Sequence, residues 1–153
     1  MATNASFAEA LANGSPAPDV TLTLEDGFSL HISAERGKPV ALFFCTSQRD
    51  PECIREARAV KQGWGRLHAQ HVVVIGVTPE DAPAHRAFIA DQELPFDLAS
   101  DTDGRIALAF RIQSSGAVAS RAVLVSSDGR IRHSWSATSP ESIVSEMLTL
   151  TGD

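Results

Sequence analysis

The order of predicted elements indicates an α/β protein with a mixed central sheet and helices on both of its faces. Residues 40–45 and 72–77 are continuous apolar runs, typical of strands covered on both sides, and a helix-start signal follows each. Alternating apolar segments joined by Asp26–Gly27 and by Asp128–Gly129 predict two β-hairpins. Strands interleaved with helices in this way favour one layered core.

The individual elements follow from local signals. Asp50 and Ser139 each precede a Pro and a Glu, the pattern of a helix N-cap and first turn. Gly63 and Gly65 interrupt the apolar pattern of the first of these helices, which we expect to bend or end there. We predict, in order, a hairpin over 20–32, a strand over 40–45, a helix from 51, a strand over 72–77, a helix reaching about 92, a short strand entered through 94–96, a short helix around 106–110, a hairpin over 121–136 and a helix from 140.

Length and composition set the broad class. The chain has 153 residues, 43% of them hydrophobic, which fits one domain over residues 14–153 preceded by a tail or short helix over 1–13. A net charge of -6 argues against nucleic-acid partners, and no apolar run is long enough to span a membrane. The N-terminus lacks the features of a signal peptide, so we expect a cytoplasmic protein. Its five histidines show no ligand spacing, so we expect no metal.

Cys53 is the first candidate for chemistry. It falls at the third position of the helix that follows a central strand, where unpaired N–H groups and the helix dipole favour a thiolate. The alternative is a small buried helix residue. Cys45 ends the strand, and we expect it to be inert. The two cysteines are eight residues apart, so the Cys-x-x-Cys motif of dithiol oxidoreductases is absent.

Several short motifs support a more specific interpretation. They are residues 14–19, Gly37–Lys38–Pro39–Val40 with Phe43–Phe44, Pro51–Glu52–Cys53 with Glu56, residues 74–78, Leu94–Pro95–Phe96, Ser100–Asp101, and Arg121 ahead of Asp128–Gly129–Arg130. In this order and spacing, over about residues 14–137, the chain resembles the peroxiredoxins of the bacterioferritin-comigratory, or Q, type. The resemblance implies a thioredoxin-like fold and reduction of hydroperoxides by Cys53, assisted by Arg121 from a later strand. Glu56 either holds that arginine in place or is a solvated helix residue.

The chain departs from the family motif Pro-x-x-x-Thr-x-x-Cys at two positions, which hold Thr46 and Asp50. Asp50 can cap the helix as threonine would, but its charge opposes a thiolate at Cys53, and Thr46 shields the sulfur less than proline does. The common position of the resolving cysteine holds Arg58. We therefore expect a one-cysteine cycle; the alternative, a bridge to Cys45 as resolving cysteine, is expected to need local unwinding.

The leading hypothesis is a thiol-dependent peroxidase that needs no bound cofactor. Its partners would be a hydroperoxide and an external thiol, either thioredoxin or a low-molecular-weight thiol, and the protein would be a monomer or homodimer. The alternative, favoured by Thr46 and Asp50, is a non-catalytic module that binds a partner or senses oxidants. A disulfide oxidoreductase using Cys45 and Cys53 is a third hypothesis.

Overall fold

The computed structural model describes residues 11–35, 37–112, 120–136 and 139–152, with the backbone alone at residues 120 and 121. The expected N-terminal helix falls mostly in residues 1–10 and so lies outside the described residues. The elements are β1 (Thr21–Thr23), β2 (Ser29–His31), the 3-10 helix η2 (Ile32–Glu35), β3 (Val40–Cys45), α1 (Pro51–Ala69), β4 (Val73–Thr78), α2 (Ala82–Gln92), β5 (Asp97–Ser100), α3 (Arg105–Ala109), β6 (Ser120–Val125), β7 (Ile131–Ser136) and α4 (Pro140–Thr151).

Five strands form a mixed central sheet in the order β5-β4-β3-β6-β7. β3, β4 and β5 are parallel, while β6 pairs antiparallel with β3 and β7. The N-terminal strands β1 and β2 form a separate antiparallel pair. Parallel strands require crossover helices, and α1 and α2 supply these connections. The predicted fold class is confirmed.

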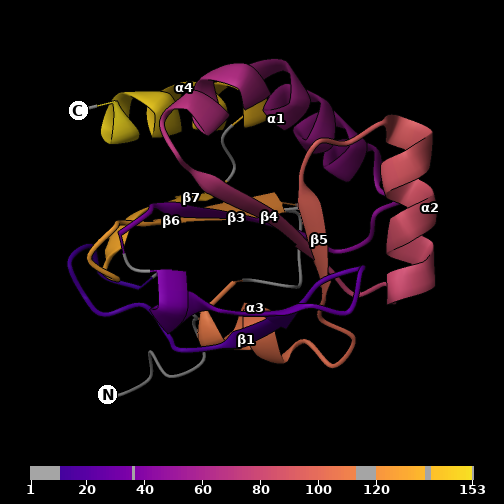
Figure 1. Cartoon of the computed structure of the whole chain (residues 1–153), viewed down its shortest axis with the longest axis horizontal. Helices are drawn as coiled ribbons and strands as arrows, with labels where there is room; N and C mark the ends of the chain where they lie inside the picture. Colours follow the sequence, from indigo (N-terminus) through magenta and orange to yellow (C-terminus); the bar gives the residue numbers. More distant parts are fainter. Residues whose placement is uncertain (1–10, 36, 113–119, 137–138, 153) are drawn as a thin grey trace, which may run out of the picture.

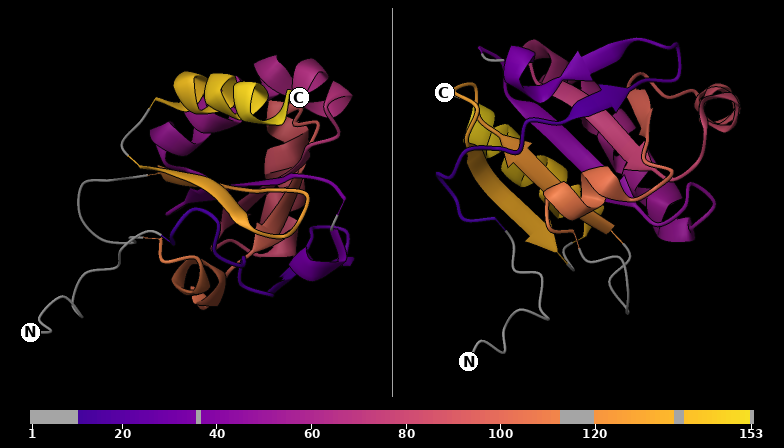
Figure 2. Two further views of the ribbon diagram at one scale, coloured as in Figure 1. Left: turned by 90° about the vertical axis from the view of Figure 1, so that its left-hand side faces the viewer. Right: turned by 90° about the horizontal axis from the view of Figure 1, so that it is seen from below.

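The sheet is the middle of three layers (Figure 1). α1 and α4 lie on one face, and α3 with the β1–β2 hairpin lies on the other, which Figure 2 shows from two further sides. The alternation of β3 divides its side chains between the faces: Ala41 and Phe43 pack under α1, whereas Leu42 and Phe44 pack towards α3. Both faces of β3 are therefore buried, as its continuous apolar sequence predicted.

β5 follows directly on Leu94–Pro95–Phe96, which was predicted to lead into a short strand. Two details differ from the sequence prediction. α1 continues through Gly63 to Ala69, and the missing side chain of Gly63 leaves room for α4, since a Cβ there would stand 2.6 Å from Val144 Cγ1. Phe28, predicted on the apolar face of the hairpin, is 72% exposed.

Candidate active site

The two cysteines lie where β3 ends and α1 begins. Asp50 is the N-cap of α1, and its Oδ1 accepts a hydrogen bond from Glu52 N at 3.0 Å. Pro51 occupies the first helical position and Cys53 the third, as predicted. Cys53 is 6% exposed. It therefore sits at the positive end of the α1 dipole, the placement that favours a thiolate once the cysteine is reduced.

Cys45 and Cys53 form a disulfide, with their Cα atoms 5.6 Å apart. The expectation that Cys45 is inert is therefore wrong, as is the expectation that a bridge needs local unwinding. The reason is the alternation of β3, which turns Cys45 to the same face as Phe43, under α1. The first turn of α1 passes over that face, so the folded chain brings the two sulfur atoms together.

The two residues that depart from the family motif contact each other. Thr46 Oγ1 donates a hydrogen bond to Asp50 Oδ2 at 3.2 Å, while the other Asp50 oxygen caps the helix. The loop between β3 and α1 is thus closed by a side-chain bond across four residues. Asp50 fills the capping role expected of it, and Thr46 gives its second carboxylate oxygen a partner.

Glu56 lies one turn after Cys53 on the buried side of α1. Glu56 is 2% exposed, so the alternative prediction of a solvated helix residue is wrong. Its Oε1 lies 3.2 Å from Cys45 Sγ. Glu56 also lines a hollow under α1, which we call the α1 hollow. Its walls include Cys45, Cys53, Phe43, Phe88 and Phe96, and its cavity volume is about 20 Å³. The cysteine pair and one carboxylate thus share a mostly apolar environment.

Residues that sequence analysis missed hold the β3–α1 loop against the start of α2. Glu80 accepts hydrogen bonds from Ser47 Oγ at 2.9 Å and from Gln48 N at 3.1 Å. Burial raises the pKa of Glu80, but hydrogen bonds from Thr78, Gln48 and Ser47 outweigh it and hold the pKa below its ordinary value. His85 is fully buried against Thr78, with 2.6 Å between Nε2 and Oγ1, and burial lowers its pKa. In the sequence, Glu80 was interpreted only as part of the helix-start signal that follows the strand over 72–77.

Arg121 is placed through its backbone. It pairs with Phe44 in the β3–β6 ladder, next to the pair formed by Cys45 and Ser120. Arg121 therefore stands on the strand that borders the cysteine pair. Its side chain lies outside the described residues.

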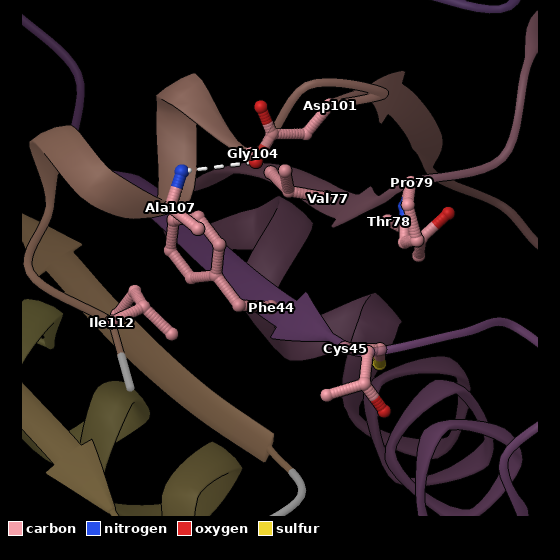
Figure 3. A pocket seen from close by; sticks show the side chains of 10 residues that line it. Phe44, Cys45, Val77, Thr78, Pro79, Asp101, Gly104, Ala107 and Ile112 are labelled. Carbon is pink, nitrogen blue, oxygen red and sulfur yellow. Dashed lines mark hydrogen bonds between the residues drawn. The ribbon is translucent and has the colours of Figure 1, made fainter. Parts of the chain in front are cut away.

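A second hollow lies across the sheet, beside α3 (Figure 3). This α3 hollow has a volume of about 200 Å³ and meets the site at Cys45 and Thr46. Phe44 and Ala107 line it, but the Cys45 sulfur lies on the other face, bonded to α1. Asp101 at its edge is used structurally, because its carboxylate accepts hydrogen bonds from Ile106 N and Ala107 N at 2.8 and 3.0 Å.

Among the described residues, no three His, Cys, Asp or Glu side chains gather as metal ligands. In the same part of the chain, no helix has the length and apolar character needed to cross a membrane.

A strand that ends at one cysteine, followed by a helix that carries the bonded cysteine in its first turn, defines a thiol-redox site on a thioredoxin-like fold. Residues 13–134 match the AhpC/TSA family, and the chain belongs to this family. The predicted resemblance to peroxiredoxins and the predicted fold are confirmed.

Individual proteins show how far the similarity extends. The chain is 33% identical to the chloroplastic peroxiredoxin Q of Triticum aestivum over 96 residues, which are 63% of this chain and 44% of that one. The chain thus spans less than half of the length of that relative. Among solved structures, peroxidoxin BcpB from Mycobacterium tuberculosis superimposes with a TM-score of 0.82 at 18% identity, over 93% of this chain and 97% of the other. Xanthomonas campestris peroxiredoxin Q gives 0.79 at 19% identity, over 92% and 96%.

Proposed function

We propose that the protein is a thiol-dependent peroxidase that reduces hydrogen peroxide or organic hydroperoxides through Cys53. The observation that carries this proposal is the position of Cys53 in the first turn of α1, bonded to Cys45. The first turn of a helix stabilises the thiolate, which is the form of cysteine that attacks peroxides. Membership of the AhpC/TSA family and the likeness to peroxiredoxin Q support the same activity.

The proposed reaction begins when the Cys53 thiolate attacks one oxygen of the O–O bond. That bond breaks, Cys53 becomes a sulfenic acid, and the second oxygen leaves as water or an alcohol once protonated. We assign Arg121 as the positive charge that stabilises the thiolate and the leaving oxygen, which its place beside the Cys45 pair on β6 supports. Asp50 and Thr46 shape the loop over the sulfur.

Cys45 is the proposed resolving thiol. It attacks the sulfenic sulfur of Cys53, forms the disulfide and releases water. The Cα separation of 5.6 Å supports this assignment, since it lies in the usual range for disulfides. This two-cysteine cycle replaces the one-cysteine cycle expected from the sequence, which rested on the lack of a cysteine at Arg58. An external thiol, either thioredoxin or a small thiol, then reduces the disulfide. The cytoplasm remains our proposed location, where disulfides are mainly transient and catalytic.

Mapping the products of one turnover tests the proposal. Reduced protein treated with one equivalent of hydrogen peroxide should yield the Cys45–Cys53 crosslink in peptide mass spectrometry. Cys45→Ser should stop at a Cys53 sulfenic acid that dimedone traps, and Cys53→Ser should leave Cys45 reduced. Unmodified Cys53 in the wild-type protein would instead favour the non-catalytic binding or sensing module.

A further inference from the structure

Glu56 brings a carboxylate to Cys45, the cysteine at the end of β3. It follows Cys53 by three residues on α1, and its Oε1 lies 3.2 Å from Cys45 Sγ. In the disulfide neither sulfur carries a hydrogen. In the reduced protein, however, the Cys45 thiol is a donor, and the same placement lets it donate to the carboxylate. One helix thus supplies Cys45 with both its bonding partner and an acceptor for its proton.

The resolving step needs such an acceptor. A protonated thiol is a poor nucleophile, so Cys45 must lose its proton as its sulfur attacks Cys53. Of the carboxylates near the start of α1, Asp50 is engaged with Glu52 N and Thr46, and the Glu52 side chain is 45% exposed. Glu56 is buried, touches Cys45 and lines the α1 hollow. Apolar walls strengthen its interaction with the thiol.

We propose that Glu56 is the catalytic base of disulfide closure. As the S–S bond forms, the Cys45 proton passes to the Glu56 carboxylate, and the group on the Cys53 sulfur leaves. When that group is hydroxide, it takes up a proton and departs as water; when it is a thiolate, it departs as such. Cys45 is oxidised in this step; the Cys53 sulfur is reduced when hydroxide leaves, and the sulfur of the departing thiolate is reduced in the other case. In disulfide reduction, Glu56 returns the proton to Cys45. The inference rests on the proposed cysteine cycle but does not require a peroxide.

A peroxide-free assay isolates this step. Reduced protein is mixed with one equivalent of 5,5′-dithiobis(2-nitrobenzoate), an aromatic disulfide that releases a coloured thiolate at each displacement. Attack by Cys53 releases the first, and closure by Cys45 releases the second. Acid quenching between the phases followed by mass spectrometry should locate the mixed disulfide on Cys53. The second phase then reports closure alone.

Three variants separate the proton transfer from structural effects. Glu56→Gln should slow the second phase at least tenfold near neutral pH and leave the first within about threefold. Its closure rate should rise about tenfold per pH unit, because Cys45 must then ionise on its own. Glu56→Asp keeps a carboxylate and should close at an intermediate rate without that rise. Glu52→Gln, the matched control on the same helix, should close at the wild-type rate.

The wild-type pH profile provides a test that no variant can confound through misfolding. Closure that is nearly independent of pH between about pH 6 and pH 8 supports an internal base. A wild-type closure rate that rises tenfold per pH unit over this range would overturn the proposal. An unchanged closure rate in Glu56→Gln would do the same. If peroxide reactivity fails while closure depends on Glu56, the fault lies in the proposed peroxidase function. If Cys53 reacts with peroxide but closure does not depend on Glu56, only the proposed role of Glu56 is wrong.

Discussion

Gly63 and Gly65 lie two residues apart in α1, and replacing each with alanine should have opposite effects on stability. Alanine favours a helix over glycine by about 1 kcal/mol, and neither glycine has a positive φ that would oppose the change. A Cβ on Gly65 meets nothing within 4 Å, so Gly65→Ala should raise the free energy of unfolding by about 1 kcal/mol.

At Gly63 the same methyl group would stand 2.6 Å from Val144 Cγ1. Val144 is 5% exposed and β-branched, so it has little freedom to move away. Overpacking of this kind costs about 1–3 kcal/mol, which exceeds the helix gain, so Gly63→Ala should be destabilising by about 1 kcal/mol. Thermal denaturation should show the melting temperatures of the two variants moving about 2–4 °C in opposite directions from wild type. Equal increases for both would refute the close α1–α4 contact.

Two further perturbations act on charged groups. Asp50→Thr keeps the helix cap but removes the negative charge, so it should lower the pKa of reduced Cys53 and speed its oxidation by peroxide several-fold. Titration of the thiolate absorbance and peroxide kinetics measure both effects. A slower reaction with no fall in the Cys53 pKa would show that the Asp50 carboxylate itself contributes to the reaction. Burial, with the hydrogen bond and charge of Glu25, raises the pKa of Asp97 from 3.8 to about 6. The resulting stabilisation is present below about pH 4 and is lost as the pH rises through 6. Glu25→Gln, which keeps an oxygen for the 2.9 Å bond from Leu98 N, should therefore raise the urea midpoint at pH 7.5 far more than at pH 4; a larger gain at pH 4 would contradict the assignment.

Elements defined by local signals were predictable from the sequence. Asp50–Pro51 and Ser139–Pro140 begin helices because a capping side chain and a fixed φ act within a few residues. The apolar run of β3 likewise required cover on both faces. The position of Cys53 in the first turn of α1 followed from these same signals.

The features that could not be predicted from the sequence depend on contacts between residues far apart in the chain. Whether Cys45 meets Cys53 depends on which face of β3 lies under α1, and spacing alone gives no answer. The burial of Glu56 has the same origin. The bond from Ser47 to Glu80 joins residues 33 positions apart, which no local pattern reveals. The close approach of α4 at Gly63 likewise joins residues far apart in the sequence, Gly63 and Val144.

The reaction of the reduced protein with hydrogen peroxide in a stopped-flow instrument tests the central claim most directly. We expect the wild-type protein and Cys45→Ser to be oxidised with the same rate constant, because Cys53 reacts first in both, and only the wild-type protein then to form the disulfide. Cys53→Ser should show no fast phase. Oxidation of Cys53→Ser at the wild-type rate would contradict the account, because the peroxide would then be reacting at Cys45.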